Sequence, residues 1–135
     1  MAIVNKAARL SIANETDVVR ARQEVRLKSQ AIGFSIVDQT RITTAASELI
    51  RNMLKYAGGG TLEMEILQNG TRSGLRIVCE DKGPGIPNLE LAMKEGYTTG
   101  NGLGYGLPGS KRLMDDFDIW SEVGKGTRVT VAKWR

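Results

Sequence analysis

The sequence predicts an α/β protein of the α+β kind, in which helices cover one face of a mixed, mostly antiparallel sheet to form a two-layer sandwich. Three observations predict this fold class. Strand-like and helix-like segments follow one another in the order β-α-α-β-β-loop-α-β-β, and short turns join two strand pairs as hairpins. The 135 residues, 41% of them apolar, are enough for one hydrophobic core, so residues 1–135 are expected to form a single domain.

The first half of the chain contains one expected strand and two expected helices. These segments are the strand 7–13, whose polarity alternates, and the helices 15–32 and 36–57. Asn14 or Thr16 would cap the first helix and Ser35 the second, because their short polar side chains accept hydrogen bonds from free backbone N–H groups. Gly33 breaks the first helix, and the glycines at 58–60 close the second.

The second half contains two expected hairpins. Their strands are residues 61–68, 75–81, 117–123 and 127–134, joined by turns at 69–74 and 124–126. Between the hairpins, the glycine-rich residues 82–106 hold at most a short helix around 88–95. A further helix over 107–116 has Pro108 in its first turn, where the missing N–H of proline does no harm.

Composition narrows the function classes. The chain has no histidine, which excludes a histidine general base, a histidine metal ligand and a phosphohistidine. Cys79 is the one cysteine, so no disulfide framework is expected and a reducing compartment fits. The N-terminal stretch lacks the apolar run of a signal peptide and no segment is long enough to span a bilayer, so a cytoplasmic protein without membrane contact is expected. The net charge of +4 suits an anionic ligand or an acidic partner.

Glu48 and Asn52 lie one turn apart on the polar side of the helix expected over 36–57. One interpretation is a solvated helix face, with Glu48 paired to Arg51 or Lys55. The functional interpretation is a carboxylate that accepts a proton beside a neutral oxygen suited to Mg²⁺. Lys55, on the same side, would then be able to reach a phosphate.

The segment EDKGPGIP (80–87) ends a strand with Asp81, Gly83 and Gly85 at alternate positions. It is interpreted either as a plain strand-ending turn or as a ligand site. In a ligand site, the glycines would let the backbone approach a flat ligand. Asp81 would accept a hydrogen bond from an exocyclic amine, with the N6 amine of adenine as the obvious candidate.

The segment TTGNGLGYGLPGSK (98–111) is the second glycine-rich stretch. It is not a dinucleotide-binding loop, because no strand precedes it, and it is not a Walker A loop, because Ser110-Lys111 follows Gly109 in place of Lys-Ser/Thr. It is either a flexible surface loop or a lid that closes over a ligand. A glycine-rich loop that leads into a helix N-terminus also provides free N–H groups for phosphates.

Taken together and in this order, the three motifs resemble those of the GHKL ATPase/kinase superfamily, whose members bind ATP in a Bergerat fold. ELIRNMLKY is similar to its N-box, DKGPG to its first glycine box, and GLGYGLPGSKRLMDDFDIWSEVGKGTRV to its second glycine box and closing strands. The resemblance covers essentially the whole chain. The last stretch resembles the RsbT-type serine/threonine-protein kinases of the bacterial stressosome, relatives of the anti-sigma factor kinases.

The resemblance implies a role for each matching residue. Glu48 would be the general base, Asn52 would hold Mg²⁺, and Asp81 would bind the adenine amine. The remaining ATP-binding positions that it implies are Lys55, Gly83, Gly85, Ile86, Gly102, Leu103, Gly104, Gly106, Leu107, Lys111 and Thr127. Lys55 and Lys111 are candidates for phosphate contacts, and Thr127 for a water-mediated contact with adenine.

The resemblance also implies partners. A kinase of this type would phosphorylate STAS-domain scaffold or antagonist proteins and, once released, bind and activate a PPM-type phosphatase. The alternatives are an anti-sigma-factor-type kinase and a nucleotide-dependent binding module with little turnover. A nucleic-acid binder is not expected, because the basic flank of the first helix lacks interleaved aromatic residues. That flank consists of Arg20, Arg22, Arg26 and Lys28.

Overall fold

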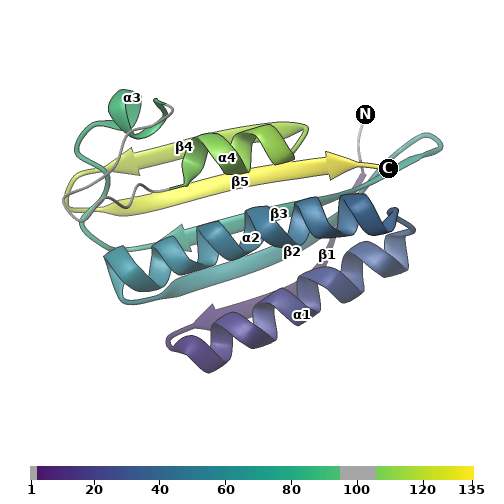
Figure 1. Ribbon diagram of the computed structural model, residues 1–135, viewed down its shortest axis with the longest axis horizontal. Helices are drawn as coiled ribbons and strands as arrows, with labels where there is room; N and C mark the ends of the chain where they lie inside the picture. Colours follow the sequence, from purple (N-terminus) through teal and green to yellow (C-terminus); the bar gives the residue numbers. More distant parts are fainter. Residues whose placement is uncertain (1–2, 95–105) are drawn as a thin grey trace.

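The computed structural model describes residues 3–94 and 106–135 and contains a sheet and helices in two layers (Figure 1). In chain order, the elements are β1 (Ile3–Ile12), α1 (Glu15–Ile32), α2 (Ile36–Ala57), β2 (Gly60–Asn69), β3 (Arg72–Asp81), α3 (Leu89–Ala92), α4 (Leu107–Leu113), β4 (Asp116–Glu122) and β5 (Gly126–Trp134). The predicted order of helices and strands is confirmed.

The strands of the described part of the chain form one sheet in the order β1-β2-β3-β5-β4, and every neighbouring pair is antiparallel. The mostly antiparallel sheet is therefore confirmed, but the prediction that it is mixed is wrong. In the sequence, α1 and α2 separate β1 from β2. The two helices bring the chain back to the C-terminal end of β1, where Ile12 pairs with Gly60 at the start of β2. β3 and β4 run in the same direction, but β5 lies between them.

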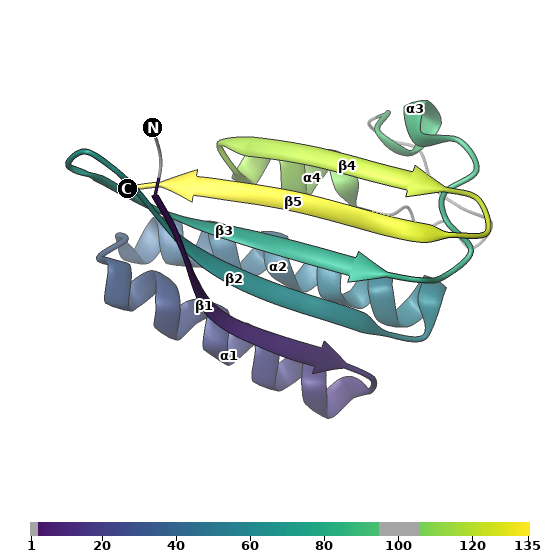
Figure 2. The same ribbon diagram turned by 180° about the vertical axis from the view of Figure 1, so that it is seen from behind.

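The helices α1, α2 and α4 lie on one face of the sheet, and the view from behind shows no described helix on the other face, called here the bare face (Figures 1 and 2). The predicted bounds of α1 and α2 are confirmed, and their caps explain them. The side chains of Asn14 and Ser35 accept hydrogen bonds from the N–H groups of Asp17 and Asp38, at 3.0 and 3.1 Å. Gly33 and Gly58 end the two helices in the left-handed conformation.

Three predicted bounds are wrong. β3 begins at Arg72 and not at residue 75, because Arg72 pairs with Asn69 of β2, which shortens the turn predicted over 69–74. β1 begins at Ile3 and not at residue 7, because its pairing with β2 continues to Gln68. α4 ends at Leu113 and not at 116, because Met114 is extended and Asp115 donates its N–H to the carbonyl of Ala132, which places Asp116 in β4. In each case the neighbouring strand, and not the local sequence, sets the bound.

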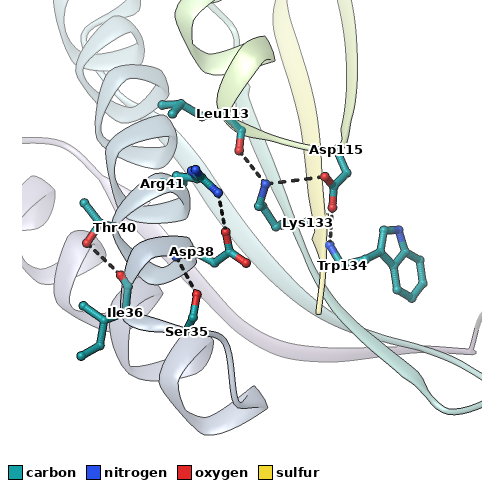
Figure 3. A network of polar contacts seen from close by, with 9 residues as sticks. All are labelled: Ser35, Ile36, Asp38, Thr40, Arg41, Leu113, Asp115, Lys133 and Trp134. Carbon is teal, nitrogen blue, oxygen red and sulfur yellow. Dashed lines mark hydrogen bonds and ion pairs between the residues drawn. The ribbon is translucent and has the colours of Figure 1, made fainter.

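Lys133 ties the C-terminal end of α4 to β5 (Figure 3). Its Nζ donates to the carbonyl oxygen of Leu113 at 3.1 Å and lies 3.5 Å from Oδ1 of Asp115. The other carboxylate oxygen of Asp115 accepts the backbone N–H of Trp134 at 2.7 Å. A lysine that is 9% exposed thus has both a carbonyl and a carboxylate partner, as a buried charge requires.

The core lies between the sheet and α2, which is the central helix of the layer. Ile42, Ile50, Met64, Leu75 and Ile77 are fully buried there. α2 therefore has a fixed position over β2 and β3, and the polar side of its second half lies at the end of the sheet where β3 stops. Across the ranges that the structure describes, no helix is long and apolar enough to cross a membrane.

Candidate functional site

A cavity opens between the C-terminal half of α2 and the adjoining ends of β3 and β5. We call this cavity the site cavity. It is lined by Leu49, Asn52, Met53, Tyr56, Ala57, Cys79, Asp81, Pro84, Gly85, Ile86, Leu107, Thr127 and Val129. Most of these side chains are apolar, and a few polar groups stand among them. A mainly apolar cleft with a few polar groups is typical of a site for a flat organic ligand.

Asp81 is the last residue of β3 and is half-buried in the site cavity. Its Oδ1 accepts the backbone N–H of Gly83 at 3.0 Å. Burial raises the pKa of Asp81; the hydrogen bonds from the backbone N–H groups of Gly83 and Thr127 oppose this rise, and repulsion from Glu80 adds to it. The carboxylate keeps acceptor capacity for a donor on a bound ligand, because each oxygen has two lone pairs.

The loop at 82–87 is held against the β4–β5 turn. Gly124 donates its N–H to the carbonyl oxygen of Pro84 at 2.9 Å, and Ile86 donates its N–H to Oγ of Ser121 at 2.8 Å. Gly85 has a φ of +77°, and a Cβ atom there would stand 2.4 Å from the carbonyl oxygen of Glu122. Position 85 therefore requires glycine both for its conformation and for its contact with β4.

Glu48 and Asn52 lie on successive turns of α2. Asn52 is half-buried and lines the site cavity, whereas Glu48 is exposed. Among the described residues, neither Arg51 nor Lys55 lies within ion-pair distance of Glu48, so the ion pair expected for a solvated helix face is absent there, whereas the exposure that this interpretation expects is present. Leu49 is buried and holds this turn of α2 in place.

Gly106 brings α4 beside Glu48. It is the N-cap of α4, with a φ of +70°, and a Cβ atom there would stand 2.6 Å from Oε2 of Glu48. The next residue, Leu107, is buried and lines the site cavity. The first residues of α4 therefore lie between the carboxylate of Glu48 and the site cavity, which also contains Asp81.

The other predicted site residues fall into three groups. Gly83 and Thr127 lie beside Asp81, as described above. Lys55 and Lys111 are exposed and are not among the described residues that line the site cavity, although Nζ of Lys55 lies 5.1 Å from the ring centroid of Tyr56. The remaining predicted residues, Gly102, Leu103 and Gly104, lie outside the described residues.

Sequence reasoning missed most of the cavity walls, although signals were available. Met53 and Tyr56 follow Leu49 and Asn52 at helical spacing, so they continue the same stripe of α2. Cys79 and Val129 lie two residues from Asp81 and Thr127, so they face the same side of their strands. Cys79 is 2% exposed, and burial raises the pKa of its thiol to about 12, with the charge of Asp81 adding to the rise.

Comparison with known proteins agrees with this geometry. The family model described as histidine kinase-, DNA gyrase B-, and HSP90-like ATPase matches residues 37–135, which include every site residue named above. The serine/threonine-protein kinase RsbT of Bacillus subtilis (strain 168) is 47% identical over 131 residues, which are 97% of this chain and 98% of that protein. An anti-sigma F factor of Clostridium kluyveri is 32% identical over 119 residues, covering 84% of this chain and 82% of that protein.

A solved structure supports the fold. Full-length ShkA in complex with AMPPNP matches 92% of this chain and 30% of its own length, with a TM-score of 0.51 and 16% sequence identity. At that identity the match concerns the fold alone. From the family model and the full-length relative, the chain belongs to the histidine kinase-, DNA gyrase B- and HSP90-like (GHKL) ATPase family and, within it, to the RsbT-type serine/threonine-protein kinases.

Proposed function

We propose that this chain is an ATP-dependent kinase that transfers the γ-phosphoryl group of Mg-ATP to a serine or threonine of a STAS-domain scaffold or antagonist protein. The observation that carries the proposal is the position of Glu48. Its carboxylate lies against Gly106 at the start of α4. Glu48 precedes Asn52 by one turn of α2, and Asn52 lines the site cavity together with Asp81. The proposed general base and one wall of the proposed nucleotide site thus belong to the same helix, α2.

The adenine of ATP would lie in the site cavity. Met53, Ile86 and Val129 offer apolar surface for the two faces of the ring, and Asp81 would accept a hydrogen bond from the exocyclic amine. A guanine ring would place a carbonyl oxygen against this carboxylate, and the repulsion between two acceptors would weaken its binding. The cavity therefore favours ATP over GTP.

Asn52 would supply one oxygen to Mg²⁺, which in nucleotide sites takes most of its remaining ligands from phosphates and water. When bound, the ion neutralises charge on the phosphates. Lys55 and Lys111 are proposed as flexible phosphate contacts, and Gly102, Leu103, Gly104 and Gly106 as the backbone around the phosphates. Asn52 lines the same cavity as the proposed adenine site, one turn of α2 after Glu48, which supports this order of base and phosphates along α2.

Glu48 would act as the general base. Its carboxylate would accept the proton of the acceptor hydroxyl as that oxygen forms a bond to the γ-phosphorus and the bond from phosphorus to the β-phosphate oxygen breaks, leaving ADP. Such a transfer depends mainly on positioning and on stabilisation of charge. The exposure of Glu48 supports this role, since a protein substrate has to reach it from solvent.

The partners are proposed from the relatives. A full-length relative at 47% identity carries the name of a serine/threonine-protein kinase, which supports transfer to a protein acceptor. We propose that phosphorylation of the STAS-domain protein releases this chain, which then binds and activates a PPM-type phosphatase in the cytoplasm. The anti-sigma F factor relative, at 32% identity, supports an anti-sigma-type kinase as the second candidate.

The test is phosphoryl transfer in vitro. The chain is incubated with Mg-ATP and a STAS-domain protein, and added phosphate is located by mass spectrometry. We expect phosphate on a serine or threonine with the wild type, none with Glu48→Gln, and wild-type transfer with Glu15→Gln, which changes an exposed glutamate in the first turn of α1. Transfer that persists in Glu48→Gln would overturn the role of Glu48. ATP binding without transfer to any STAS-domain protein tested would favour the nucleotide-dependent binding module.

A further inference from the structure

Three polar side chains form a row across the end of the sheet. Asp81 on β3 pairs with Thr127 on β5, which in turn pairs with Ser121 on β4. All three face the helix-covered side, because they alternate along their strands with exposed residues such as Glu80, Arg128 and Glu122. Asp81 and Thr127 line the site cavity, and Ser121 lies behind Thr127 as its cross-strand neighbour.

Ser121 has three polar contacts. Its Oγ accepts the backbone N–H of Ile86 at 2.8 Å, lies 3.0 Å from the carbonyl oxygen of Gly126, and lies 2.8 Å from Oγ1 of Thr127. A serine hydroxyl has one proton and two lone pairs. All three contacts are satisfied only if Ser121 donates to Gly126, which can only accept, and accepts from both Ile86 and Thr127.

This arrangement commits the proton of Thr127. Its hydroxyl donates to Ser121, so that Oγ1 presents only lone pairs to the site cavity, where the carboxylate of Asp81 also presents lone pairs. The polar end of the cavity therefore offers acceptors and, from these two side chains, no donor. Such a pair matches a ring edge that carries an amine, directly or through a bridging water, and not an edge that carries a carbonyl.

We infer that Ser121 is a positioning residue for nucleotide selection: it orients the hydroxyl of Thr127 as an acceptor and holds the backbone of Ile86 at the cavity wall. This inference rests on the proposed binding of ATP in the site cavity. Without the hydroxyl of Ser121, Thr127 is free to rotate and donate into the cavity. A 6-oxo purine then gains a donor that the wild type withholds, while adenine loses a fixed partner.

The test compares two variants of nearly equal shape, Ser121→Thr, which keeps a hydroxyl, and Ser121→Val, which lacks one. Dissociation constants for ATP and for inosine triphosphate, which carries a carbonyl in place of the amine, are measured by calorimetry. We expect Ser121→Val to bind ATP about tenfold more weakly, the change for loss of one well-placed hydrogen bond, and to bind inosine triphosphate within threefold of the wild type. Ser121→Thr, unlike Ser121→Val, should keep most of the wild-type preference for ATP over inosine triphosphate. Thr130→Val, on the bare face of β5, controls for loss of a hydroxyl from the sheet.

If Ser121→Val leaves the ratio of the dissociation constants for ATP and inosine triphosphate unchanged, Ser121 has no role in nucleotide selection. Amide hydrogen exchange of Ile86 gives a readout that needs no nucleotide: in Ser121→Val and Ser121→Ala we expect exchange at Ile86 to accelerate by more than the loss of global stability accounts for. Unchanged protection of Ile86 would overturn the inference whatever the nucleotide results. Absence of ATP binding by the wild type would instead contradict the proposed function.

Discussion

Asp81 at the end of β3 pairs across the sheet with Thr127 of β5, whose backbone N–H favours the charged form of the Asp81 carboxyl and so opposes the rise in pKa that burial causes. The backbone N–H of Gly83 donates to Oδ1 of Asp81 at 3.0 Å and fixes this carboxylate from its own loop. Asp81 is thus oriented before any ligand binds. Preorganised acceptors of this kind bind a ligand donor without the entropic cost of ordering a free side chain.

Replacement of Asp81 by asparagine should weaken ATP binding by about tenfold to a hundredfold, because an amide offers fewer lone pairs and can turn its NH₂ group toward the adenine amine. Calorimetry with ATP measures the loss. Glu80→Gln is the matched control, since Glu80 is adjacent in sequence but lies on the bare face, 3.7 Å from Arg128. Equal losses in the two variants would contradict a direct role of Asp81.

The same substitution should raise stability at neutral pH. Burial raises the pKa of Asp81, so the folded state favours the neutral form more strongly than the unfolded state does. A carboxyl whose pKa is higher in the folded state stabilises the fold at pH values below its unfolded pKa, about 3.9. This stabilisation is lost as the pH rises through the pKa of the folded state. Asp81→Asn should therefore have a higher melting temperature than the wild type at pH 7. The difference between the two melting temperatures should become smaller as the pH falls toward about 4. Asp118→Asn, an exposed carboxylate on β4, is the control, and a gap that stays constant with pH would contradict the explanation.

Gly106→Ala should lower kcat more than it changes KM for ATP. The added Cβ atom would stand 2.6 Å from Oε2 of Glu48 and displace that carboxylate, and the left-handed conformation at Gly106 adds a stability cost of about 1 kcal/mol. Gly70→Ala is a close match, because Gly70 has a φ of +63° and nothing within 4 Å of its added Cβ atom. Phosphotransfer kinetics and thermal unfolding of both variants separate the two effects. Similar kcat values in the two variants would contradict the contact with Glu48.

Two buried serines should respond in opposite directions to alanine. Oγ of Ser110 in α4 has no hydrogen-bond partner among the described residues, whereas Oγ of Ser29 donates to the carbonyl of Arg26 at 2.8 Å. Ser110→Ala should raise the free energy of unfolding by about 1 kcal/mol, because it removes an unsatisfied buried hydroxyl, and Ser29→Ala should lower it by a similar amount. Denaturant unfolding measures both. A loss of stability in Ser110→Ala would mean that its hydroxyl has a partner in solution.

Much of the fold follows from local sequence signals. Ser35 and Gly58 mark the ends of α2 because capping and the left-handed C-terminal turn depend on single residues at known positions. The start of β1 does not follow from such signals: Ile3 pairs with Gln68, and this pairing exists only once β2 is in place. Among the described strands, the absence of parallel pairing likewise depends on β5 entering the sheet between β3 and β4, a choice that the order of elements leaves open.

The candidate site divides in the same way. Glu48, Asn52, Asp81 and Gly85 follow from motifs in which residue type and spacing carry the chemistry. The role of Ser121 does not, because its contact with Ile86 joins residues 35 positions apart and requires both hairpins to be folded. Leu49 is a core residue that also lines the site cavity, since the inner end of the cavity is the edge of the core.

Cys79 gives the molecule an internal reporter. Its thiol is the one sulfhydryl of the chain, lies in the lining of the site cavity, and has a pKa raised to about 12 by burial. An alkylating reagent reacts with the thiolate, so it can modify Cys79 only in molecules in which this part of the sheet has opened to solvent. The rate of alkylation therefore records how often the site cavity opens, in a protein that carries no added label.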